Sequence, residues 1–85
     1  MAKEKEVGKV THYFTNIGVA VVELSDTLKI GDRIHILGHT TDFEQTVESM
    51  QIDKKPVETA KKGQSIGLKV AERAREGDTV YKIEE

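Results

Sequence analysis

The sequence contains no cysteine, no tryptophan and a single proline among its 85 residues. Without cysteine the protein forms no disulfide bond, has no thiol nucleophile and holds no thiolate-bound metal, so a reducing cytoplasm is the compartment we expect. The longest apolar run, residues 19–22, is far shorter than the ~20 residues that span a bilayer as a helix. Residues 1–6 are charged and lack the apolar segment of a signal peptide. We therefore expect no membrane partner.

Aromatic residues make up 5% of the chain, and its formal net charge is −2. Few rings limit base stacking, and the slight acidity disfavours bulk electrostatic binding of nucleic acid, although a local basic patch could still bind it. The 36% hydrophobic and 33% charged residues are typical of a soluble globular domain. A chain of this length buries a modest core. We expect a single domain over residues 7–85, preceded by a flexible N-terminus over residues 1–6.

Two glycine–aspartate corners, Gly31-Asp32 and Gly77-Asp78, each precede a short alternating segment. After the first corner, Ile34 and Ile36 point to one side of the predicted strand and the residues between them point to the other. This pattern is typical of a strand that is buried on one face. We expect a positive φ angle at each glycine and an aspartate that accepts hydrogen bonds from the turn amides.

Short stretches rich in β-branched and aromatic residues recur along the chain, separated by turn residues. They predict six strands, over residues 7–14, 17–24, 33–37, 43–52, 65–70 and 79–83. The alternation changes face within the fourth, so we expect a bulge near Glu48 and Ser49. Pro56 interrupts the next segment, and residues 53–62 are predicted to be a turn or connector. This pattern predicts an all-β fold, a small closed barrel, because closure leaves no exposed strand edge.

Four segments carry a family resemblance by their order and spacing: residues 28–38, 47–60, 61–70 and 75–80. Together they resemble the second domain of translational GTPases, the β-barrel that follows the GTP-binding domain in elongation factor Tu, elongation factor 1-alpha and initiation factor 2. The resemblance implies a closed six-stranded Greek-key-type barrel over nearly the whole chain. The glycine-rich phosphate loop that ends in Gly-Lys-Ser/Thr is absent, so we expect no GTP binding. Ile17 stands where the family usually has an arginine, and Gln51 where it has a glutamate.

The basic residues supply the leading hypothesis for function. Four lysines bracket Pro56 and two arginines precede the last predicted strand, and each could contact a phosphate without reading the base sequence. The resembling domain holds the 3′ end of tRNA in elongation factors. We therefore interpret the chain as a stand-alone, non-catalytic binding module that contacts ribosomal or transfer RNA. The candidate RNA-binding residues are Lys54, Lys55, Lys61, Lys62, Arg73, Arg75 and Gln51.

Two other interpretations stay open. Glu58, Glu72 and Glu76 are interleaved with the basic residues, a pattern that also fits a solvated surface without a ligand. Similar barrels occur as the C-terminal domain of collagenase-like peptidases, where they resemble accessory modules without catalytic residues. The chain would then be a protein–protein accessory subunit of a larger enzyme, and reversing the lysine charges would have little effect on its function.

The sequence offers little for catalysis or metal binding. His35 and His39 are separated by a predicted strand end and a glycine, and no convincing carboxylate partner lies near them in sequence, so we expect surface imidazoles. Glu44 and Glu48 could share one face of a strand as an acid–base pair, but acidic residues that face water are ordinary. No serine lies in a nucleophile-elbow motif. We expect no enzymatic activity, no metal and no cofactor.

Overall fold

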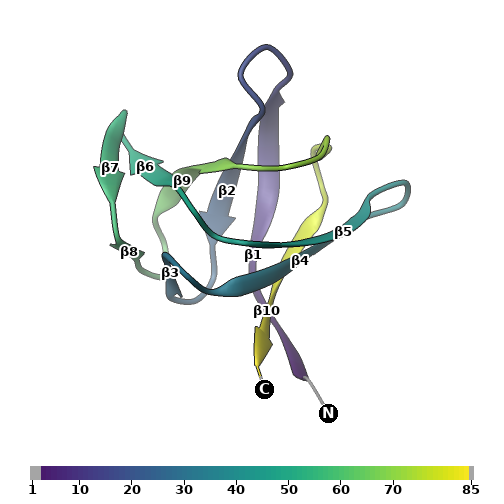
Figure 1. The fold of residues 1–85 in the computed structure, drawn as a ribbon, viewed down its shortest axis with the longest axis horizontal. Coiled ribbons are helices and arrows are strands. Elements are labelled where there is room, and N and C mark those ends of the chain that lie inside the picture. Colours follow the sequence, from purple (N-terminus) through teal and green to yellow (C-terminus); the bar gives the residue numbers. More distant parts are fainter. Residues whose placement is uncertain (1–2, 85) are drawn as a thin grey trace.

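The computed structural model describes residues 3–84, and every regular element in this part of the chain is a β-strand. The strands are β1 (Lys3–Phe14), β2 (Val19–Leu24), β3 (Leu28–Lys29), β4 (Arg33–Leu37), β5 (Asp42–Thr46), β6 (Met50–Ile52), β7 (Lys55–Val57), β8 (Thr59–Ala60), β9 (Ser65–Lys69) and β10 (Thr79–Glu84). Eight form one antiparallel sheet in the order β5-β4-β10-β1-β2-β9-β6-β7, and β3 pairs with β8 in a separate ribbon (Figure 1). The all-β prediction is confirmed, whereas the predicted number of strands is wrong. Residues 3–84 contain no helix long and apolar enough to cross a membrane.

No strand pairing closes the eight-stranded sheet within residues 3–84, so the predicted closed six-stranded barrel is not formed by a continuous backbone ladder. Instead, the side-chain amide of Gln45 on β5 reaches the end of β9. Its Nε2 donates to the carbonyl of Lys69 at 2.9 Å, and its Oε1 accepts from the N–H of Ala71 at 2.7 Å. One side chain, with a donor and an acceptor of its own, thus links strands that share no ladder.

The predicted bulge near Glu48 and Ser49 is a complete break between two strands. β5 pairs with β4 at one end of the sheet, whereas β6 pairs with β9 and β7 near the other end. Between them Val47 is buried. Its N–H donates to the carbonyl of Asp32 and its carbonyl accepts from the N–H of Gly31, each at 2.8 Å. Because Val47 bonds this corner instead of a strand partner, residues 42–52 can cross from one end of the sheet to the other.

Residues 53–62, predicted to be a connector, contain two further strands. β6 and β7 form a hairpin in which Ile52 pairs with Lys55, so Asp53 and Lys54 make a two-residue turn with φ angles of 51° and 65°. A two-residue hairpin turn of type I′ needs positive φ at both central residues. Pro56 lies on β7, the last strand of the sheet, where a residue without an N–H is tolerated.

The glycine–aspartate corners have the predicted geometry. Gly31 has a φ angle of 94°, and the carboxylate of Asp32 accepts a hydrogen bond from the N–H of Lys29 at 2.9 Å. Gly77 has a φ angle of 90°, and the carboxylate of Asp78 accepts a hydrogen bond from the N–H of Arg75 at 2.7 Å. The repeated corner is therefore a structural device that leads the chain into β4 and β10.

A third turn of the same design precedes β9 and was not predicted. Gly63 has a φ angle of 89°, and Gln64 takes the place of the aspartate. The Oε1 of Gln64 accepts from the N–H of Lys61 at 2.8 Å, and the N–H of Gln64 donates to the carbonyl of Lys61 at 3.1 Å. Each of the three turns begins with a basic residue, followed two residues later by glycine.

Strand β1 begins before the predicted start at residue 7. Lys3 pairs with Glu84 and Glu6 pairs with Tyr81, so the segment predicted to be a flexible N-terminus contributes to the β1–β10 strand pair. Residues 1–2 and residue 85 lie outside the described part of the chain. The β1 strand is long because β10 supplies a partner along its whole first half.

The alternation predicted for β4 is confirmed. Ile34 and Ile36 are fully buried, and Arg33 lies on the exposed face. Ile34 and Ile36 belong to one apolar cluster that extends over both sheets. Its buried members are Val7, Val10, Ala20, Val22, Leu24, Leu28, Ile34, Ile36, Phe43, Val47, Met50, Ala60, Ile66, Leu68, Val70, Ala74 and Val80.

Candidate functional site

The four predicted lysines lie in two different turns. Lys54 and Lys55 belong to the β6–β7 hairpin, where Lys54 is a central residue of the turn. Lys61 and Lys62 follow β8, in the turn that contains Gly63. All four are exposed, as is Gln51 on β6. Within residues 3–84 no hydrogen bond or ion pair involves the side chains of these five candidates.

The two predicted arginines, Arg73 and Arg75, lie in the connector between β9 and β10. In Figure 1 this connector is on the opposite side of the molecule from β7. Both arginines line a hollow of about 260 Å³ beside the β4–β5 turn, together with the carboxylates Asp42 and Glu72. The hollow therefore has charges of both signs. The structure does not bring the predicted lysines and arginines together on one surface.

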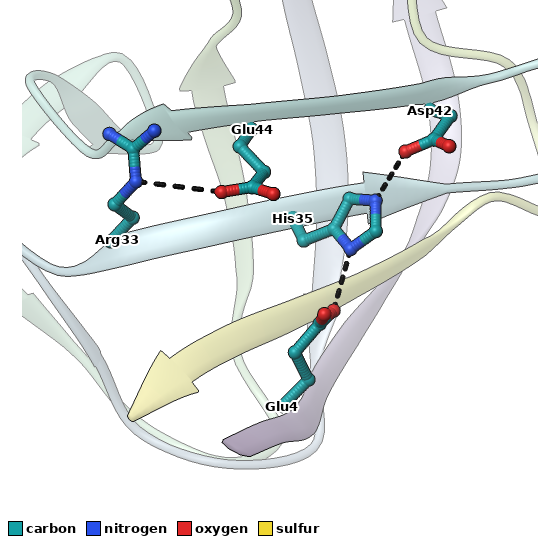
Figure 2. A network of polar contacts seen from close by, with 5 residues as sticks. All are labelled: Glu4, Arg33, His35, Asp42 and Glu44. Carbon is teal, nitrogen blue, oxygen red and sulfur yellow. Dashed lines mark hydrogen bonds and ion pairs between the residues drawn. The ribbon is translucent and has the colours of Figure 1, made fainter. Parts of the chain in front are cut away.

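A polar cluster centres on His35 of β4 (Figure 2). Its Nδ1 lies 2.6 Å from Oε1 of Glu4 on β1, and its Nε2 lies 2.5 Å from Oδ1 of Asp42 on β5. The His35 side chain is only 14% exposed. Nearby, Nε of Arg33 lies 3.6 Å from Oε1 of Glu44. The imidazole of His35 thus connects β4 to β1 and to β5 through contacts between side chains.

His35 thus lies on the outer face of β4 but has two carboxylate partners that the sequence did not predict, whereas His39 is exposed in the turn. Asp42 was missed because the β4–β5 hairpin register was not predicted. That register places Leu37 opposite Asp42, so Asp42 is a diagonal neighbour of His35 on one face of the sheet. Glu4 lay in the segment predicted to be flexible. A correct hairpin register would have revealed Asp42 as a partner of His35 from the sequence. Only the pairing of β1 with β10 reveals Glu4 as the other partner.

Both ring nitrogens of His35 face carboxylate oxygens, an arrangement that favours the protonated form of the ring. A neutral imidazole has one N–H, so only the protonated ring donates to both partners. The hydrogen bond with Asp42, and then that with Glu4, raises the pKa of His35 although desolvation opposes the shift. An imidazole with both ring nitrogens occupied by carboxylates is poorly suited to act as a general base. Among residues 3–84, no group of three His, Asp or Glu is arranged to hold a metal ion.

The His35 cluster predicts a specific pH dependence of stability. The pKa of His35 is raised in the folded protein, so its contribution is fully present below the ordinary pKa of about 6.5 and is lost as pH rises through the folded-state value. We expect the free energy of unfolding, measured by urea titration, to fall as pH rises above about 6.5. His35→Gln should remove much of this fall.

His39→Gln is the matched control, because His39 is exposed and within residues 3–84 forms no hydrogen bond. This variant should keep the pH dependence of the parent. An unchanged fall in the His35→Gln variant would show that the carboxylate contacts of His35 do not stabilise the fold.

An apolar groove lies between β7 and the corner that follows β3. Its exposed apolar surface comes from Ile30, Pro56 and Val57, whereas Met50, which also lines it, is almost fully buried. The groove has a volume of about 410 Å³. Two carboxylates, those of Glu48 and Glu58, also line it. The predicted acid–base pair is not assembled here, because Glu44 faces Arg33 and Glu48 lies beyond the end of β5. The groove offers apolar and anionic contacts without an obvious nucleophile–base pair.

No protein-family model matches the chain. The chain is 48% identical over 81 residues to an uncharacterized protease of Methanocaldococcus jannaschii, and 42% identical over 80 residues to a collagenase of Porphyromonas gingivalis. These matches cover 94% and 92% of this chain but only 20% and 22% of the relatives. The chain therefore spans about a fifth of the length of the curated relatives that it matches.

A solved structure has the same fold. It is the C-terminal domain of a Geobacillus thermoleovorans protein described as a U32 peptidase, with a TM-score of 0.86 and 21% sequence identity. The superposition covers 92% of this chain and 91% of that one. At this identity the likeness concerns the fold alone.

These comparisons correct the interpretation of the chain as a translation-factor module. The similar sequences belong to proteases, and the matching fold is that of a C-terminal domain of a peptidase, so the predicted relationship to elongation factor Tu and its relatives is wrong. The predicted RNA or ribosome partner loses its basis with that relationship. The alternative, an accessory part of a collagenase-like peptidase, agrees better with the comparisons.

Proposed function

We propose that this chain is an accessory module that associates with a U32-type, collagenase-like peptidase and that it carries no catalytic residues. The observation that carries the proposal is the 48% identity over 94% of this chain, which corresponds to only a fifth of a protease. This chain matches only a minor part of a larger protease and has the fold of a peptidase C-terminal domain. Both observations fit a module that assists a separate catalytic part.

The polar side chains of the described residues support a non-catalytic role. His35 uses both ring nitrogens to hold carboxylates, and Glu44 lies beside Arg33. Peptide hydrolysis needs a nucleophile or activated water together with a base that can accept its proton. The histidine with the most polar contacts is therefore committed to holding strands together and is not available as that base.

Two measurements test the proposal. The purified 85-residue chain should release no fragments from gelatin or from fluorogenic peptides. Tagged and expressed in its native host, it should co-purify with one stoichiometric polypeptide that mass spectrometry identifies as a U32-type peptidase. Hydrolysis that co-purifies with the isolated chain, or recovery of ribosomal proteins in place of a peptidase, would contradict the proposal.

A further inference from the structure

The groove beside β7 exposes aliphatic surface in a protein that buries such residues elsewhere. Ile30 is 39% exposed, whereas Ile34 and Ile36, in the strand that follows, are fully buried. Pro56 is exposed and Val57 is half-buried on the other wall. Concave apolar surface with a few polar groups is the usual character of a ligand site, and a volume of about 410 Å³ is in the usual range.

Backbone hydrogen bonds hold the two walls of the groove at a fixed separation. The N–H of Ile30 donates to the carbonyl of Glu58 at 2.9 Å, which ties the corner after β3 to the end of β7. The N–H of Gly31 donates to the carbonyl of Val47 at 2.8 Å, which ties the same corner to the segment before β6. A preorganised groove loses little conformational freedom when a ligand binds.

The charges at the groove favour a cationic ligand. Glu48 and Glu58 are both exposed, and within residues 3–84 neither carboxylate forms an ion pair. The other glutamate of this region of the chain, Glu44, lies beside Arg33 instead. Two carboxylates without partners beside an aliphatic wall are complementary to a ligand that carries a positive charge next to an apolar group.

The size of the groove indicates a short ligand. Seven residues line it, whereas a stable protein–protein interface takes about 20–30 residues a side. The neighbouring edge strand β7 contains Pro56, which lacks an N–H, so the addition of a full β-strand is disfavoured. A ligand that fits these limits is recognised mainly by one or two side chains.

We propose that the groove binds a short extended peptide segment in which an aliphatic residue precedes lysine or arginine. The aliphatic side chain lies against Ile30, Pro56 and Val57, and the cationic group lies near the carboxylates of Glu48 and Glu58. The inference rests on the proposed function, since such a segment is taken to be part of a polypeptide substrate of the enzyme. The accessory domain would then hold substrate chains for the catalytic part.

The test is a titration of the uniformly ¹⁵N-labelled chain with the blocked peptide acetyl-Gly-Leu-Lys-Gly-amide, followed by NMR. We expect weak, saturable shifts confined to the backbone amides of Ile30, Met50, Val57 and their chain neighbours. Peptides in which leucine is replaced by serine, or lysine by glutamate, should bind more weakly. The variant Glu48→Gln/Glu58→Gln should bind the parent peptide about threefold to tenfold more weakly, as is typical for the loss of two exposed ion pairs.

Glu72→Gln is the matched control, because Glu72 is exposed and lines the hollow that contains the two arginines. It should bind the peptide as the parent does. The proposal is overturned if no saturable shift occurs at about 10 mM peptide, if the glutamate peptide binds equally well, or if the double variant is unaffected. Shifts in the groove that depend on the concentration of the protein alone would indicate a second copy as the occupant and would also overturn it.

The result can be separated from that of the capture experiment. A chain that captures a U32-type peptidase but does not bind the peptide keeps its proposed function and loses the substrate groove. Loss of the peptidase upon Glu48→Gln/Glu58→Gln, with no peptide binding by the parent, would assign the groove to the enzyme itself and contradict the substrate proposal.

Discussion

Replacement of Leu68 by alanine should lower the free energy of unfolding by about 2–5 kcal/mol. Leu68 is fully buried on β9, where it pairs in register with Ala20 of β2 and Met50 of β6. Truncation removes apolar contacts on both sides and leaves a cavity that the surrounding strands close only partly. The total stability expected for a domain of this size is about 4–13 kcal/mol, so the variant should be close to unfolding at 37 °C. Urea titration followed by circular dichroism measures the change.

Leu37→Ala supplies the same chemical change at a surface position. Leu37 ends β4 and is 38% exposed, so its truncation should cost about 1 kcal/mol or less. Equal losses in the two variants would mean that Leu68 does not lie in the packed core. A change in the urea m-value of Leu68→Ala would indicate an altered unfolded or native state in addition to a cavity.

Replacement of Gly8 by alanine should also destabilise the protein, by about 1–3 kcal/mol. Gly8 lies at an irregularity of the β1–β10 pairing and faces β2. A Cβ atom at this position would lie 2.7 Å from Cγ1 of Val22 and 2.8 Å from the carbonyl oxygen of Glu23. That oxygen belongs to the backbone of the neighbouring strand and cannot move away without shifting the strand. For a domain of this size the loss should lower the melting temperature by roughly 4–8 °C per kcal/mol.

Gly67→Ala is the control for the strand position itself. A Cβ atom at Gly67 would lie 3.4 Å from Cγ1 of Val19 and 3.9 Å from the carbonyl oxygen of Gln51, which are ordinary contacts. Alanine there should be tolerated or slightly stabilising, since it restricts the unfolded chain. If Gly8→Ala unfolds at the same temperature as the parent, the close approach of β1 and β2 is not a feature of the protein in solution.

Local chemistry explains the parts of the fold that could be predicted. The alternation around Ile34 and Ile36 predicts a strand and its buried face because successive side chains of a strand point in opposite directions. The corners at Gly31 and Gly77 could be predicted because glycine adopts positive φ without steric cost, and the adjacent aspartate can reach the turn amides. The third corner, with Gln64 in place of aspartate, could have been found from the same spacing.

Predictions that depended on long-range pairing were less successful. Residues 43–52 have the composition of one strand, yet Val47 bonds the Gly31 corner and divides them between the two ends of the sheet. Pro56 suggested a connector, but the outer edge of a sheet tolerates a missing donor. The lysines and arginines share a charge, and charge alone does not place side chains from different turns on one surface.

The sequence by itself determined the all-β class, the buried face of β4 and the conformation of its two glycine–aspartate corners. These features depend on side-chain alternation and turn preferences over a few neighbouring residues. Only the tertiary structure decided that Gln45 links β5 to β9, that His35 holds Glu4 and Asp42, and that Ile30 and Val57 line one groove with Glu48 and Glu58. Each of those contacts joins residues from separate strands or turns, and their proximity follows from strand order and register, which local preference does not specify.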